Sequence, residues 1–136
     1  MTHDDFIAQV DAIRRVFDQL LTSPAFTNGT NLPKDAKGRA VYLFSDDKRP
    51  RYVGLTQRLR NRYRCHLSGA ERNRSSFARR LIANNQADDF HSAYEMINAM
   101  KFQYVLVDSQ LDLHLLELYT ACRLEVPFSY VSFSNK

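Results

Sequence analysis

Two tyrosines stand in short apolar runs on either side of a charged turn, Tyr42 in AVYLF and Tyr52 in RYVGL. Side chains alternate between the two faces of a strand, so their even separation, ten residues, predicts both phenols on one face. A three-residue turn at 46–48 would set them directly opposite each other. Gly54 falls on the same face, where it leaves the space that a side chain would fill.

An arginine and a histidine follow in the stretch QRLRNRYRCHL. Arg62 and His66 are i and i+4 in the helix that this stretch predicts, so they share one stripe of its surface. A guanidinium is a forked, permanently charged donor suited to phosphate, and an imidazole titrates near neutrality. Two phenols, a guanidinium and an imidazole therefore converge on one spot. Each also has an ordinary interpretation, as a half-buried strand aromatic, a solvated arginine or a surface histidine.

The positive charge is concentrated in the same part of the chain. Residues 48–80 hold eleven Lys and Arg against one acidic residue, a net charge of +10, whereas the rest of the chain carries −6. A basic block in an otherwise acidic protein indicates a surface that faces a polyanion. An arginine-rich solvated face without a ligand is the alternative, and charge by itself does not separate the two.

Composition indicates one folded domain. The chain has 136 residues, of which 44% are hydrophobic and 25% charged, which suits an ordinary core. No apolar run approaches the roughly 18 residues that a membrane helix needs, and the acidic, amphipathic start is not typical of a secretory signal. Cys65 and Cys122 form no C-x-x-C pair and are expected to be free thiols in a reducing cytoplasm.

Periodicity predicts an α+β domain with a small sheet. The stretch 4–21 repeats apolar residues every three or four positions, which is typical of an amphipathic helix, and a loop rich in Pro and Gly follows it. Strands are predicted at 39–45, 50–55 and 102–108, with a last strand or extended tail at 128–133. Further helices are predicted from Thr56 as N-cap to about Ser68, and at 75–85, 88–100 and 111–125.

The pattern resembles the GIY-YIG nuclease family. The residues that carry the resemblance are Val41-Tyr42, then Tyr52-Val53-Gly54, then Thr56-x-x-Leu59-x-x-Arg62-x-x-x-His66, and finally Leu116-Glu117-Leu118-Tyr119 after the VLVD strand. The resemblance covers about residues 38–133. It implies a three-stranded antiparallel sheet flanked by helices in a nuclease domain at 38–136. Residues 1–37 are then an N-terminal helix and connecting loop packed on the core.

The resemblance also implies an activity, the hydrolysis of phosphodiester bonds in DNA with one divalent metal ion. Glu117 would be the sole protein ligand of Mg²⁺ or Mn²⁺, a hard cation that prefers carboxylate oxygens. Arg62 would brace the scissile phosphate, where negative charge develops. Tyr42, His66 and Tyr52 would position or deprotonate the attacking water. The residues leave the choice of base open, and the resemblance favours Tyr42.

The basic stretch fits contact with a DNA backbone. Phosphate contacts give affinity and a salt dependence without reading sequence. The arginines expected to make them are Arg58, Arg72, Arg74, Arg79 and Arg80. The sequence leaves open whether the protein has a protein partner or forms a homodimer, and a membrane partner is not expected.

Two positions depart from the family pattern. Ala40 stands where the family usually has glycine, and Val131 stands where some members carry asparagine, with Ser129 and Asn135 as nearby polar substitutes. A missing polar anchor would weaken catalysis. The alternatives are therefore a nucleic-acid-binding module that has lost cleavage and, further off, an α+β interaction domain whose arginines face an acidic protein.

Overall fold

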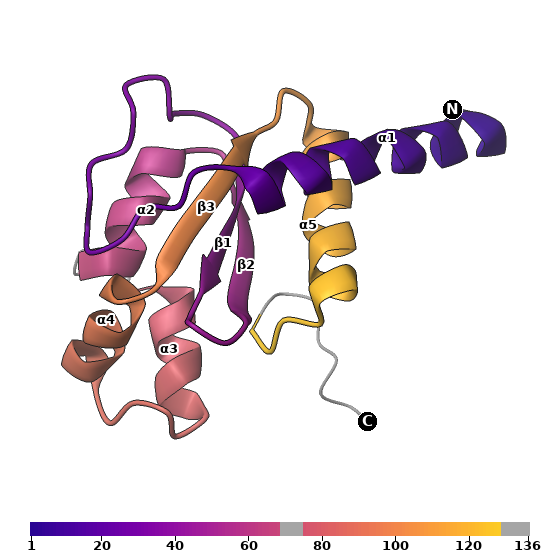
Figure 1. Ribbon diagram of the computed structural model, residues 1–136. Helices are drawn as coiled ribbons and strands as arrows, with labels where there is room; N and C mark the ends of the chain where they lie inside the picture. Colours follow the sequence, from indigo (N-terminus) through magenta and orange to yellow (C-terminus); the bar gives the residue numbers. More distant parts are fainter. Residues whose placement is uncertain (69–74, 129–136) are drawn as a thin grey trace.

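The computed structural model describes residues 1–68 and 75–128, and it forms three strands and five helices within these ranges (Figure 1). Their bounds are α1 His3–Thr22, β1 Ala40–Ser45, β2 Pro50–Thr56, α2 Leu59–Ser68, α3 Ser76–Ala83, α4 Phe90–Asn98, β3 Lys101–Leu106 and α5 Gln110–Leu124. The predicted final strand at 128–133 lies outside the described residues except for Phe128. None of the described helices is long and apolar enough to cross a membrane.

The strands form an antiparallel sheet in the order β2-β1-β3, as the predicted fold class requires. The prediction that Tyr42 lies opposite Tyr52 is wrong, because Tyr42 pairs with Gly54 and Phe44 pairs with Tyr52. The connection is longer than the three-residue turn predicted, and an irregularity between Phe44 and Ser45 shifts the register further. A shift of two residues preserves the side-chain face, so both phenols still lie on the same side.

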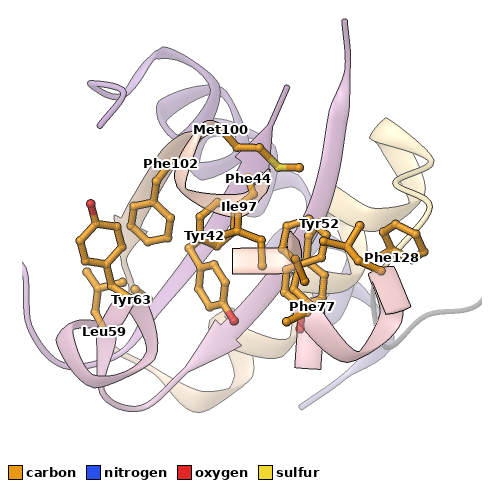
Figure 2. Packing of buried hydrophobic residues seen from close by; sticks show 14 of the residues in the cluster. Tyr42, Phe44, Tyr52, Leu59, Tyr63, Phe77, Ile97, Met100, Phe102 and Phe128 are labelled. Atoms are coloured by element: carbon orange, nitrogen blue, oxygen red, sulfur yellow. The ribbon is translucent and has the colours of Figure 1, made fainter. Parts of the chain in front are cut away.

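Helices cover both faces of the sheet (Figure 1). Even-numbered side chains of β1 face α2, α3 and α4, and they form an aromatic core that includes Tyr42, Phe44, Tyr52, Phe77 and Phe102 (Figure 2). Odd-numbered side chains such as Val41 and Leu43 face α1 and α5 in a second, largely aliphatic core. The two cores follow directly from the alternation of side chains along a strand.

The helix after β2 begins later than predicted. Thr56 ends β2, and α2 starts at Leu59, so the prediction of Thr56 as N-cap is wrong by two residues. The Thr56 hydroxyl instead accepts the backbone N–H of Arg58 at 3.0 Å, and the Arg58 carbonyl accepts the first helical N–H, that of Arg62, at 3.1 Å. The Thr56 side chain thus stabilises the connection between β2 and α2, although Thr56 itself is not part of the helix.

The outer edge of β2 is partly covered by the chain that follows α5. The Val53 N–H donates to the Phe128 carbonyl at 3.4 Å, and the Phe128 N–H donates to the Arg51 carbonyl at 3.3 Å. This parallel bridge pairs Phe128 with Tyr52 and does not reach Leu55 within the described residues. The last part of β2 therefore has an edge that Phe128 does not pair.

Candidate active site

Tyr42 lies against the backbone of Gly54. A Cβ atom at position 54 would stand 2.5 Å from Cζ of Tyr42 and 3.0 Å from its Cε1, closer than side chains approach one another. Gly54 has no positive φ, so the space for the phenol is the reason that glycine is needed here. The predicted role of Gly54 as an open place on this face is confirmed.

His66 is completely buried and hydrogen-bonded at both ring nitrogens. The Tyr42 hydroxyl lies 2.7 Å from Nε2, and the hydroxyl of Ser75 lies 2.5 Å from Nδ1. Burial, with a smaller contribution from the charge of Arg62, lowers the pKa of His66 to about 3. The imidazole is therefore neutral at physiological pH and holds a single N–H.

Tyr52 belongs to the same cluster. Its ring centroid lies 6.2 Å from that of Tyr42 and 5.3 Å from that of His66, and it stacks on Phe77 at 4.6 Å. Its hydroxyl lies 2.6 Å from the hydroxyl of Ser76. The structure thus brings Tyr42, Tyr52 and His66 together.

The beginning of α3 supplies two hydroxyls that the sequence analysis missed. Ser75 caps α3 by accepting the Ala78 N–H at 3.0 Å, and Ser76 is the first residue of the helix. Ser75 reaches His66 and Ser76 reaches Tyr52. A serine before an apolar helical run predicts an N-cap, but nothing local predicts which side chain of another element it will meet.

Arg62 lies on α2 one turn before His66 and is half-buried. Its charge lowers the pKa of His66, and both Arg62 and Arg79 oppose the effect of burial, which raises the pKa of the Cys65 thiol. Arg62 of α2 and Arg79 of α3 are therefore both close enough to Cys65 for their charges to act on its thiol. The predicted i, i+4 alignment of Arg62 with His66 is present.

The other predicted phosphate-binding arginines fall into two groups. Arg58 and Arg79 are exposed, and Arg80 is half-buried. Arg72 and Arg74 lie outside the described residues. The described members stand at the start of α2 and along α3, both on the aromatic-core side of the sheet.

Glu117 comes from α5, on the opposite face of the sheet. The residue is only 7% exposed, and burial raises the pKa of its carboxyl, an effect that the backbone N–H of Leu55 partly offsets. Within the described residues, its Oε2 atom has no hydrogen-bond partner. Leu55 directly follows Gly54, so the carboxyl meets β2 next to the glycine on which the Tyr42 phenol lies.

The chemistry around this carboxyl fits a bound cation. A buried carboxylate oxygen without a partner is costly, and a divalent cation would compensate it. Residues 1–68 and 75–128 contain no group of three or more His, Cys, Asp or Glu side chains placed to share a metal ion. A cation at this carboxyl would therefore take Glu117 as a single ligand from the described part of the chain.

Comparisons with known proteins give matches among solved structures. No protein-family model and no curated protein match the chain. The structure resembles a GIY-YIG endonuclease domain. The N-terminal endonuclease domain of UvrC from Thermotoga maritima, bound to magnesium as its catalytic divalent cation, is 19% identical over 87% of this chain and 96% of that one, with a TM-score of 0.45. Two point mutants of that domain, also bound to the catalytic cation, are 17% and 18% identical over 88% of this chain and 97% of theirs, with TM-scores of 0.47 and 0.46.

Proposed function

We propose that the protein is a divalent-metal-dependent endonuclease that hydrolyses phosphodiester bonds in DNA. The observation that carries the proposal is the approach of two different groups to one point of β2. The phenol of Tyr42 lies over Gly54 from one face of the sheet, and the carboxyl of Glu117 lies at the adjacent Leu55 from the other. A potential proton acceptor and a potential metal ligand thus lie at adjacent residues of β2, on opposite faces of the sheet.

Glu117 would hold the metal, Mg²⁺ or Mn²⁺, through its unpartnered Oε2. When bound, the cation supplies charge that stabilises the negative oxygens of the phosphate in the transition state. The Leu55 N–H orients the carboxyl, and packing of α5 on β2 excludes water from most of it. Glu117 thereby presents one oxygen in a fixed direction.

Arg62 would bind the scissile phosphate, because its guanidinium is permanently charged and offers paired donors. Tyr42 would take the proton of the attacking water, with the neutral His66 bonded to its oxygen. Tyr52 would position that water or the phosphate from the same face. Free tyrosine has a pKa near ~10, so the charge of Arg62 and of the metal would have to favour the phenolate of Tyr42.

The activity is tested with supercoiled plasmid DNA in the presence of Mg²⁺ or Mn²⁺. We expect nicking by the wild-type protein and a loss of about 100-fold or more in Glu117→Gln and in Arg62→Ala. Glu95→Gln is the matched control, because Glu95 is an exposed carboxylate on α4. Calorimetric titration with Mn²⁺ should show binding to the wild type and to Glu95→Gln, and no binding to Glu117→Gln.

The alternatives have distinct outcomes in the same experiment. Salt-sensitive DNA binding without nicking in any metal would reject the endonuclease and indicate a nucleic-acid-binding module of this fold. If the protein neither binds nor nicks DNA, the hypothesis of an interaction domain would remain. Nicking that persists in Glu117→Gln would remove that residue from the mechanism.

A further inference from the structure

A continuous chain of hydrogen bonds runs from α3 to the phenol over Gly54. Ser75 Oγ meets Nδ1 of His66, and Nε2 of the same ring meets the hydroxyl of Tyr42. Ser75, His66 and Tyr42 are all buried. We infer that Ser75 is a positioning residue whose hydroxyl donates to Nδ1 and so keeps the imidazole proton on Nε2, where it donates to the oxygen of Tyr42.

The protons of the chain can be arranged in two directions, and the ionised state of Tyr42 in the proposed reaction distinguishes them. The neutral ring has one N–H, because its pKa is about 3, and each hydroxyl has one O–H. If the ring proton were on Nδ1, it would donate to Ser75 Oγ, which already accepts the Ala78 N–H. The O–H of Ser75 would then be buried with no recorded acceptor among the described residues, which is unfavourable.

The opposite direction satisfies Ser75 and both ring nitrogens, and it also satisfies Tyr42 once the phenol is ionised, as the proposed function requires, because an ionised oxygen has no proton to donate. The Ser75 hydroxyl accepts from Ala78 and donates to Nδ1, as a serine can do at the same time. The proton on Nε2 is then directed at the oxygen of Tyr42, 2.7 Å away. This is the arrangement that stabilises negative charge on the phenol oxygen.

The catalytic meaning of this arrangement rests on the proposed function. With its proton on Nε2, His66 has no lone pair on the nitrogen that faces Tyr42, so it acts as a donor and not as the base. In the hydrolysis, the proton of water passes to the ionised Tyr42 oxygen while the water oxygen bonds to phosphorus. The bond from phosphorus to the leaving oxygen breaks, and solvent protonates that oxygen. Ser75 thereby determines which of the two candidate bases is able to act.

The tautomer is measured directly by ¹⁵N NMR of the metal-free protein labelled at histidine. The chain has four histidines, and His66→Gln assigns the signal of His66. We expect a neutral ring protonated at Nε2 in the wild type. Ser75→Ala should populate the Nδ1-protonated form, and Ser75→Thr, which keeps the hydroxyl, should restore the wild-type pattern. A wild-type ring protonated at Nδ1 would overturn the inference.

Kinetic measurements test whether the Ser75 hydroxyl affects catalysis, and they distinguish that effect from the loss of a helix cap. Ser75→Ala should lower kcat for plasmid nicking by about tenfold or more with little change in KM, and Ser75→Thr should recover most of it. Asp89→Ala is the matched control, because Asp89 caps α4 by accepting the Ser92 N–H and should change neither kcat nor the tautomer.

The remaining outcomes are also decisive. An unchanged tautomer and kcat in Ser75→Ala, or an equal loss in Asp89→Ala, would reduce Ser75 to a helix cap and reject the inference. Absence of nicking by the wild type would reject the proposed function, while the NMR measurement would still decide the role of Ser75.

Discussion

At the scale of single residues, Gly54 matters because it has no side chain. Gly54 allows the Tyr42 ring to lie on the strand, and this contact places the Tyr42 hydroxyl next to His66. The glycine acts through volume and not through backbone conformation. Its replacement should therefore displace the phenol and leave the strand intact.

Gly54→Ala should lower the free energy of unfolding by about 1–3 kcal/mol, because the new methyl group overlaps the Tyr42 ring. Urea unfolding measures this cost, and plasmid nicking should fall with it as the phenol moves away from His66. In a Tyr42→Leu background the same substitution should cost less, since the atoms that it meets are gone. An equal cost in both backgrounds would show that the overlap is not the cause.

At the scale of elements, the two faces of the sheet hold different residues of the candidate site. The cluster of Tyr42, Tyr52 and His66 is held by α2 and α3, whereas Glu117 belongs to α5, which packs against α1. Phe17 of α1 meets Tyr119 of α5 edge to face at 5.2 Å. We therefore propose that residues 1–37 are a structural cover that fixes α5 and take no part in the chemistry.

Phe17→Ala should lower the free energy of unfolding by about 3–5 kcal/mol, since Phe17 is buried. Ile7→Ala on the same helix should cost only about 0.5 kcal/mol or less, because Ile7 is 46% exposed. Thermal and urea unfolding compare the two variants. At temperatures where both are folded, the ¹⁵N signal of His66 should stay as in the wild type. A changed signal in Phe17→Ala would mean that α1 influences the aromatic side of the sheet.

At the scale of the whole molecule, charge distinguishes the two sides of the protein. Arg58 and Arg79 are exposed on α2 and α3 or at their ends, and Arg14 is exposed on α1, across the sheet. A DNA backbone bound over the candidate site would release counterions only from the arginines that it contacts. Substituting two arginines on one side and one on the other tests where the DNA lies.

Arg79→Ala and Arg58→Ala should each reduce the slope of log K against log salt concentration by about one for duplex DNA, because each removes one phosphate contact. Fluorescence anisotropy with labelled duplex in EDTA measures binding without cleavage. Arg14→Ala should leave the slope unchanged. Equal slopes in all three variants would contradict contact through α2 and α3.

Much of the site was predictable because its spacing is local. Even separation along strands put Tyr42 and Tyr52 on one face, and the helical repeat aligned Arg62 with His66; both relations hold in the structure. These patterns depend only on the geometry of a single strand or helix, which the order of residues determines. The class of fold, an α+β domain with a small sheet, followed from the same periodicities, and the antiparallel pairing of its strands was implied by the family resemblance.

Tertiary structure decided the pairings between elements. The register that sets Gly54 beneath Tyr42 depends on the length of a turn and an irregularity in one strand, and no propensity specifies either. The bond from Ser75 to His66 and the approach of Glu117 to Leu55 join residues of different elements. Such contacts arise from how helices pack on a sheet, so the chain carries their residues in its sequence while only the packed fold brings them together.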